Sequence, residues 1–523
     1  MDRRWDGVGS RIGVAAAGAA PEAVAPGLVS GPGVAAPERR APRSFEVHEA
    51  TIAALQAALA DGRVTSASLV DAYLERIGAY DGKLRAVLRI NASSRTEAER
   101  LDRERAARGP RGPLHGVPIL LKDNFDMHDL PTTGGSIALD GMVPPDDAFV
   151  VRRLRDAGAI VLAKTNLHEL AAGITTISSL GGQTRNPYDT ERCPGGSSGG
   201  TGAGVAASYA AIGYGTDTCG SIRIPAAFNA LYGLRPTKGL VDMDGVIPLS
   251  HSQDVAGPLA RTVADLAIGL DAIVGLYPAD PATRTHETAR APRFEAALRA
   301  DAPRGARIGV LDALFDGEGS DAEVLAIVRA AIERLCGQGA EIVAVEIDGL
   351  GAMLEDTSLI EHEFKFDLFD YLAATPGAPV HSLGEILEKQ LYHPALEVKF
   401  RKRDEPVARD TPAYRAALGR RAALRAAVLE AMDRGRLDAL AYPVMRTRPA
   451  RIDEAQLGET CQLSASTGTP AIAIPAGFTA DGLPIGLELL GRPLDDARLV
   501  GFAFAIEQAS APRRPPPLTP PLG

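Results

Sequence analysis

The sequence is poor in several features that mark particular classes of protein. Its 523 residues include four cysteines, Cys193, Cys219, Cys336 and Cys461, and no two of them form a CxxC pair. Such wide spacing gives no support for a zinc site or a disulfide framework. We therefore expect a reducing compartment.

An excess of positive charge is also lacking. The formal net charge is −10, and no basic stripe with interleaved aromatic residues is present. Nucleic acid is therefore not expected as a direct ligand. His362 lies between two glutamates, but a single histidine in a charged helical pattern is more typical of a solvated helix face than of a metal site. We predict neither a metal nor a cofactor.

No apolar run is long enough to span a bilayer, so we predict no membrane span. Residues 1–44 are rich in Ala, Gly and Pro and contain Arg3 and Arg4 before a weak apolar run, as an export signal does. The acidic residues Asp2 and Asp6 flank these arginines and favour a disordered extension instead. We predict a cytoplasmic protein whose Pro-rich tail, residues 512–523, is extended and unpacked.

Between the two ends, helical and strand-like patterns alternate. Apolar residues at helical spacing are followed repeatedly by short buried runs, such as "HGVPILLKDN" and "GAIVLAKTN". This alternation predicts the α/β class, with an α/β/α sandwich around a large mixed, mostly parallel sheet. We expect a single domain over residues 45–511, with a variable helical insertion around residues 350–410.

A stretch dense in glycine and serine, residues 192–225, reads "RCPGGSSGGTGAGVAASYAAIGYGTDTCGSIRIP". It lacks the lysine of a phosphate-binding P-loop. Ser198 is central in a GxSxG match, which is typical of a nucleophile elbow, but the residues before it are turn-like rather than a buried strand. A hydrolase site that uses one serine from each glycine-rich patch is the third interpretation.

Ser221 suits this third interpretation because it follows a strand and precedes a helix. The backbone N–H groups of Thr218, Cys219, Gly220 and Ser221 could converge there on a developing oxyanion. This arrangement predicts acyl transfer.

The serine needs a base, and no histidine stands in a suitable setting. A buried lysine can serve, because burial favours its neutral form. Lys122 and Lys164 each end an apolar strand. The pattern of residues alone does not indicate which of the two lysines is the base.

Residues 195–239 resemble the glycine- and serine-rich signature of the amidase signature family over its whole length. Supporting stretches are "LHGVPILLKDN", "VLAKTN", "GGQTRNPYD", "SQDVAGPLARTVADL" and "TGTPAIAIPAGFTADGLPIGLELLG". The resemblance covers residues 45–511, and it is closer in pattern to bacterial stand-alone amidases, peptide amidases included, than to more specialised members.

The resemblance implies a Ser-Ser-Lys triad. Ser221 matches the nucleophile, Ser197 the bridging serine with a cis peptide bond, and Lys122 the general base. Lys164 would then be structural.

We also make predictions for three residues close to Ser221 in the sequence. Asp217 and Arg223 would support the loop by charge-assisted hydrogen bonds. Cys219 stands where the family usually has glycine. We expect activity to be kept, with Cys219→Gly within about tenfold in kcat. Cys219 as the nucleophile is the weaker alternative.

The predicted function is hydrolysis of a small-molecule or peptide carboxamide to a carboxylate and ammonia or an amine. A homodimer is compatible with this prediction. The alternatives are an A subunit of a tRNA-dependent amidotransferase and a catalytically silent amidase-like binding protein. Residues 171–180, 358–372 and 459–468 are expected to line the substrate pocket, and their mixed polarity indicates no particular acyl group.

Overall fold

The computed structural model describes residues 45–275, 293–317 and 319–522. The chain from Phe45 onward forms one compact unit. The predicted N-terminal extension, residues 1–44, lies outside the described residues.

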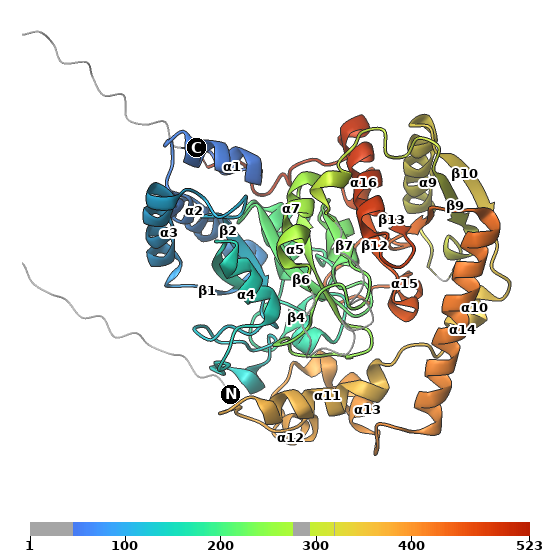
Figure 1. Ribbon diagram of the computed structural model, residues 1–523. Helices are drawn as coiled ribbons and strands as arrows, with labels where there is room; N and C mark the ends of the chain where they lie inside the picture. The colour runs from blue at the N-terminus through green and yellow to red at the C-terminus, as the bar shows by residue number, and fades with distance from the viewer. Residues whose placement is uncertain (1–44, 276–292, 318, 523) are drawn as a thin grey trace, which may run out of the picture. The chain divides into compact units, whose positions relative to one another are not determined.

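One large sheet organises this unit (Figure 1). Its eleven strands follow the order β1-β3-β2-β6-β8-β7-β12-β13-β11-β9-β10. The strands are β1 (Val87–Ile90), β2 (Pro118–Lys122), β3 (Ile160–Thr165), β6 (Ile212–Asp217), β7 (Tyr232–Arg235), β8 (Val255–Ala260), β9 (Arg307–Leu311), β10 (Glu341–Val345), β11 (Ala439–Pro443), β12 (Ala471–Phe478) and β13 (Pro484–Leu490). A separate hairpin joins β4 (Ile177–Ser178) to β5 (Gly182–Gln183).

The sheet is mixed. Its parallel pairs are β3 with β2, β2 with β6, β11 with β9, and β9 with β10. The remaining neighbours pair antiparallel. The predicted α/β/α architecture around a large mixed sheet is confirmed.

Helices surround the sheet. The α-helices are α1 (Ile52–Ala60), α2 (Ser66–Leu84), α3 (Ser94–Arg108), α4 (Phe149–Asp156), α5 (Gly199–Ala206), α6 (Arg223–Phe228), α7 (Val263–Ile273), α9 (Ala322–Gly337), α10 (Leu350–Leu354), α11 (Ile360–Ala374), α12 (Leu383–Glu388), α13 (Glu397–Asp404), α14 (Pro412–Gly435), α15 (Gln462–Thr467) and α16 (Asp496–Ser510). The short 3-10 helices are η1 (Ile137–Leu139), η2 (Glu169–Ala171), η3 (Glu295–Ala297), η4 (Asp312–Leu314) and η5 (Pro394–Leu396).

Strand β6 shows why the sheet carries helices on both faces. Successive side chains of a strand point to opposite faces. A Cβ at Gly213 would lie 2.5 Å from Thr201 of α5, so this position lets α5 pack closely. The neighbouring Tyr214 points the other way, where its hydroxyl donates to the carbonyl of Gly269 in α7 at 3.3 Å. All six residues of β6 are buried, as expected for a strand covered on both faces.

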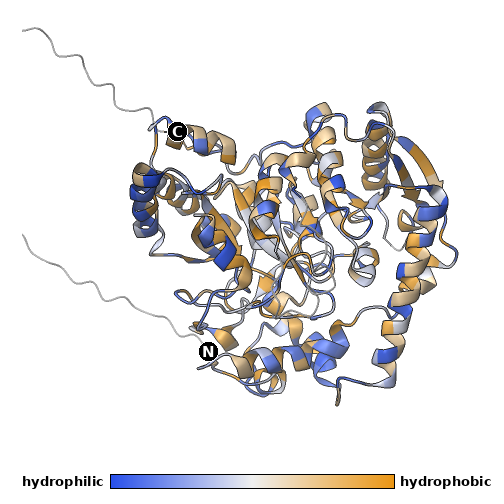
Figure 2. Ribbon diagram, in the orientation of Figure 1, coloured by the Kyte–Doolittle hydropathy of each residue, from blue (hydrophilic) through white to orange (hydrophobic). Residues whose placement is uncertain are grey.

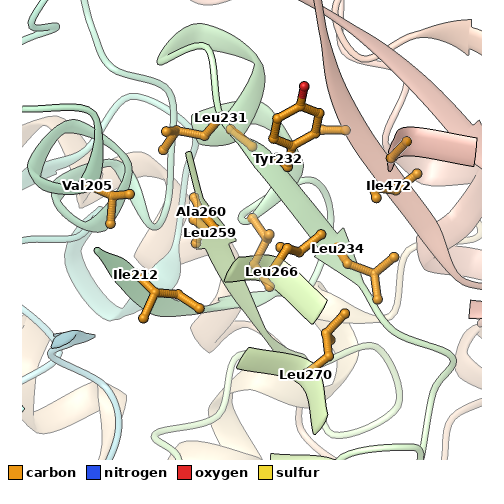
Figure 3. Close-up of a cluster of buried hydrophobic side chains, with 14 of the residues drawn as sticks. Val205, Ile212, Leu231, Tyr232, Leu234, Leu259, Ala260, Leu266, Leu270 and Ile472 are labelled. Carbon is orange, nitrogen blue, oxygen red and sulfur yellow. The ribbon is translucent and has the colours of Figure 1, made fainter. Parts of the chain in front are cut away.

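Aliphatic side chains fill the layer between the sheet and α7 (Figure 3). Leu266 and Leu270 of α7 lie beside Leu234 of β7. All three are fully buried. By contrast, α3 is largely hydrophilic (Figure 2), and only three of its residues are buried.

A second apolar cluster lies under the helices of residues 350–410. Its members from α11, α12 and α13 include Phe364, Leu383 and Phe400. They pack together with Ala171, the last residue of η2, and with Leu249, which lies between β7 and β8. Helices α11, α12 and α13 therefore have an apolar core of their own, which also includes residues from these two segments.

The prediction of an unpacked C-terminal tail is wrong. The buried guanidinium of Arg76 donates to the carbonyls of Thr519 and Pro520, each at 3.0 Å. Tyr80 also donates to Pro520 at 2.8 Å. A proline-rich chain makes no backbone ladder of its own, so its carbonyls are free to accept these bonds.

None of the described helices is long and apolar enough to cross a membrane.

Candidate active site

Two loops bring the serines of the two glycine-rich patches together beside β6. Ser197 and Ser198 precede α5, and Ser221 lies between β6 and α6. The N–H of Ser198 donates to the carbonyl of Ser221 at 3.1 Å. The Gly196–Ser197 peptide bond is cis, as the family resemblance implied.

Ser198 does not face the cavity described below. Its hydroxyl donates to the carbonyl of Thr216 at 3.2 Å and is fully buried. A Cβ at Gly215 would lie 2.5 Å from that hydroxyl, so β6 needs glycine there. This geometry argues against the nucleophile-elbow interpretation, in which Ser198 would be exposed to substrate.

Lys122, at the end of β2, lies next to Ser197. Its Nζ is 2.7 Å from Ser197 Oγ and 2.7 Å from Thr216 Oγ1. The side chain is fully buried and forms no ion pair with any described residue. Burial lowers the pKa of Lys122 to about 7, although Asp254 and Asp217 oppose this shift from a distance. Lys122 can therefore be neutral near neutral pH.

Lys164 has a different environment, although it is equally buried. Its Nζ forms an ion pair with Asp123 at 2.9 Å. It also donates to the carbonyl of Phe125 at 2.9 Å and to the hydroxyl of Thr132 at 3.0 Å. The amine of Lys164 is thus engaged in an ion pair, whereas the amine of Lys122 contacts only hydroxyl groups, so these contacts distinguish the two lysines.

Thr216 and Asn124 belong to the site, and the sequence analysis missed both. The amide of Asn124 donates to Thr216 Oγ1 at 3.1 Å, beside the contact from Lys122. Thr216 is thus held as a fixed neighbour of the lysine amine. Asn124 stands two residues after Lys122 in the motif "LLKDN", which was the available signal.

Asp217 holds the loop that follows β6. Its carboxylate accepts from the N–H of Gly220 at 2.8 Å and of Ile222 at 3.2 Å. It also forms buried ion pairs with Arg223 and Arg235, each at 3.1 Å. Burial alone would raise the pKa of Asp217, but the two arginines hold it well below its usual range. The carboxylate is therefore charged and fixes the turn.

One predicted oxyanion donor is already engaged. Because the N–H of Gly220 donates to Asp217, Gly220 is a poor candidate for binding an oxyanion. In the part of the chain that is described, the N–H groups of Cys219 and Ser221 donate to no protein acceptor. These two groups flank Gly220 and are the better candidates, together with Thr218.

A cavity of about 260 Å³ opens at Ser221 and Cys219. All three predicted wall segments contribute to it, through residues that include Ile174, Ile360 and Gln462. That this cavity is the substrate pocket stays a prediction.

Two cations of α13 also line this cavity, and the sequence analysis did not single them out. Arg403 is 7% exposed, and its Nε and Nη1 have no hydrogen-bond partner among the described residues. Its guanidinium lies 5.5 Å from the ring centroid of Phe364. Burial, and then the charge of Arg403, lower the pKa of Lys399. Glu459 is the acidic residue in the lining.

The family model called Amidase matches residues 68–500. The chain belongs to the amidase family. Among curated relatives, it is 37% identical to the A subunit of the glutamyl-tRNA(Gln) amidotransferase from Moorella thermoacetica, over 86% of this chain and 94% of that protein. It is also 37% identical to the protein of the same name from Thermobifida fusca, over 89% and 96%.

Solved structures of amidase relatives share the fold. The native peptide amidase of Stenotrophomonas maltophilia has a TM-score of 0.83 at 40% identity, covering 90% of this chain and 98% of that one. The A subunit of the glutamyl-tRNA(Gln) amidotransferase from Thermotoga maritima has a TM-score of 0.70 at 25% identity, covering 89% and 96%.

Within this amidase fold, the two cysteines nearest the site form a disulfide. Cys219 is bonded to Cys461, 242 residues later, with a Cα–Cα distance of 5.2 Å. The expectation of no disulfide is therefore wrong, because residues so far apart in sequence show no pairing pattern. Cys219 also has no free thiol with which to act as the nucleophile. The prediction of a reducing compartment loses its basis, since disulfides persist mainly in oxidising compartments.

Proposed function

We propose that the protein hydrolyses a carboxamide through an acyl-enzyme on Ser221, with Ser197 and Lys122 completing the triad. The observation that carries the proposal is the environment of Lys122. A buried lysine without an ion pair, with a pKa of about 7 and its Nζ 2.7 Å from Ser197 Oγ, is suited to accept a proton. Ser221 lines the cavity, and its carbonyl accepts from the N–H of the residue that follows Ser197, so its hydroxyl is the one that substrate can reach.

In the acylation step, Ser221 Oγ attacks the amide carbonyl carbon. The proton of Ser221 passes to Ser197 Oγ, and Ser197 gives its own proton to the neutral amine of Lys122. The N–H groups of Thr218, Cys219 and Ser221 stabilise the negative oxygen of the tetrahedral intermediate. The C–N bond then breaks, and the proton held by Lys122 returns through Ser197 to the leaving nitrogen.

In the deacylation step, water attacks the ester carbonyl carbon of acylated Ser221. Its proton follows the same route through Ser197 to Lys122, which is neutral again. Collapse of the second intermediate returns a proton to Ser221 Oγ and releases the carboxylic acid, which ionises. The hydrolysis needs no co-reactant other than water.

Ammonia release from a panel of primary aliphatic, aromatic and peptide amides tests this proposal. We expect at least one class to be hydrolysed, and we expect Ser221→Ala to remove that activity because it removes the atom that is acylated. Ser198→Ala is the matched control, since Ser198 bonds to Thr216 rather than facing the cavity. A folded protein that hydrolyses no amide and takes no label from a fluorophosphonate would favour the silent binding protein instead.

The unpaired guanidinium of Arg403 favours a second candidate, the A subunit of an amidotransferase. A buried cation without a partner is unfavourable unless a ligand brings a negative charge. Glutamine is an amide that carries a carboxylate, so it could supply that charge in the same cavity as Ser221. The curated relatives named above are amidotransferase subunits.

Arg403→Met tests this second candidate. If a carboxylate binds there, the variant should raise the KM for glutamine by about 10- to 100-fold, the loss expected for one charge-assisted contact. Hydrolysis of an uncharged amide should change little. Equal effects on both substrates, or no glutamine hydrolysis with or without amidotransferase partner subunits, would leave the stand-alone hydrolase as the better account.

A further inference from the structure

The disulfide joins the loop that carries Ser221 to a wall of the cavity. Cys219 lies two residues before Ser221, and Cys461 is the N-cap residue of α15. Cys219 and Gln462, the first residue of α15, both line the cavity. The cross-link therefore connects the loop of the candidate oxyanion donors directly to the wall of the cavity.

Cys461 also packs against the backbone between those donors. A Cβ at Gly220 would lie 2.9 Å from the Cβ of Cys461 and 2.6 Å from Ile224. Gly220 has a φ of +82°, which also favours glycine. The turn at Gly220 therefore packs closely against Cys461, which is bonded to Cys219.

A second connection ends at the same residue. The carbonyl of Cys461 accepts from Arg223 at 3.3 Å. Arg223 is paired with Asp217, which holds the N–H of Gly220. The loop between β6 and α6 is therefore linked to Cys461 twice, by the disulfide at Cys219 and by the side chain of Arg223.

We propose that Cys461 is a positioning residue for catalysis, which through its disulfide fixes the N–H groups of Cys219 and Ser221 toward the oxyanion. The inference rests on the proposed function. Preorganised donors stabilise the developing charge only when they are held in place. Turnover should therefore depend on whether this pair is a disulfide or two thiols.

Reduction can reach the pair because Cys219 is partly exposed at the cavity. One thiolate of a small dithiol such as dithiothreitol attacks Cys219 Sγ, the S–S bond breaks, and Cys461 leaves as a thiolate. The second thiol of the reagent then displaces Cys219, and the reagent becomes a cyclic disulfide. Two electrons pass from the reagent to the protein, and the two cysteines end as thiols after taking up protons.

The experiment measures kcat and KM of the oxidised and the reduced protein, with thiols counted by Ellman's reagent under denaturing conditions. The count should rise from two, for Cys193 and Cys336, to four. We expect kcat to fall about 10- to 100-fold on reduction, as for donors displaced by a fraction of an ångström to an ångström. Reoxidation should restore it.

Variants separate this role from general effects of thiol reagents. Cys219→Ser and Cys461→Ser should each show the lowered kcat and no longer respond to reductant. This replaces the expectation from the sequence that Cys219→Gly stays within about tenfold in kcat, because that expectation left out the bond to Cys461. The double variant should be no worse than either single one, because both break the same bond. Cys336→Ser, which removes an exposed free thiol, should keep full activity and full sensitivity.

Three outcomes would overturn the inference. The first is an unchanged kcat while the thiol count rises to four. The second is a loss that follows only the unfolded fraction, measured by circular dichroism at the assay temperature. The third is an oxidised protein that hydrolyses no amide and takes no fluorophosphonate label, because the proposed function has then failed and the inference fails with it.

Discussion

Lys122→Met is expected to lower kcat/KM for any amide that the protein hydrolyses by at least about 10³-fold, as loss of a triad member does in other hydrolases. Methionine fills similar space but cannot accept the proton from Ser197. Because the variant removes a buried amine that has no ion pair, its thermal midpoint should not fall. Steady-state kinetics and thermal unfolding, measured on the same preparation, test both parts.

The pH dependence of stability gives Lys122 a second signature. Its pKa is lowered from 10.5 to about 7 in the folded protein. Between these two values the unfolded chain binds more protons than the folded one, so this residue makes stability rise with pH from about 7 to 10.5. Lys122→Met should remove that contribution, and kcat/KM of the unmodified protein should fall as pH drops below about 7.

Lys164→Met should instead lower the free energy of unfolding by about 3–5 kcal/mol, because it leaves Asp123 buried without its partner. Urea unfolding measures this loss. Adding Asp123→Asn to the variant should recover part of it, since the unpaired charge is then gone.

The comparison of these two lysine variants decides which one is the base. A folded Lys164→Met that has lost all turnover, beside an active Lys122→Met, would contradict the assignment made from their contacts.

The fold was predictable because its signals are local. Apolar runs such as "HGVPILLKDN" end at the strand boundary that the structure shows, with Lys122 as the last residue of β2. The hairpin from β12 to β13 turns at Asp481 and Gly482, where an Asp-Gly pair predicts a turn. Such patterns need only neighbouring residues.

Contacts between distant residues were not predictable in this way. The pairing of Cys219 with Cys461 depends on where α15 lies in space, and no spacing rule indicates it. The same holds for Arg76, whose partners in the tail lie more than four hundred residues away. The proline-rich composition of residues 512–523 predicted an unpacked tail. Composition alone does not show that the carbonyl groups of this tail accept hydrogen bonds from a buried arginine.

The candidate site has features that the sequence predicts and features that depend on contacts in the folded protein. The serines of the two glycine-rich patches were found from the sequence, and the family resemblance indicated which lysine to choose. The ion pair of Lys164 with Asp123, and the engagement of Gly220 by Asp217, are properties of the folded loops. They decide which groups are free to react, and only the structure supplies them.

Labelling with a fluorophosphonate, followed by peptide mapping, identifies the nucleophile directly. The probe forms a bond with the hydroxyl that acts as the nucleophile, and the labelled peptide identifies that residue. We predict a single label on Ser221 in the oxidised protein, absent from Ser221→Ala and strongly slowed in Lys122→Met. A label on Ser198, or full labelling of Ser221→Ala, would contradict this prediction.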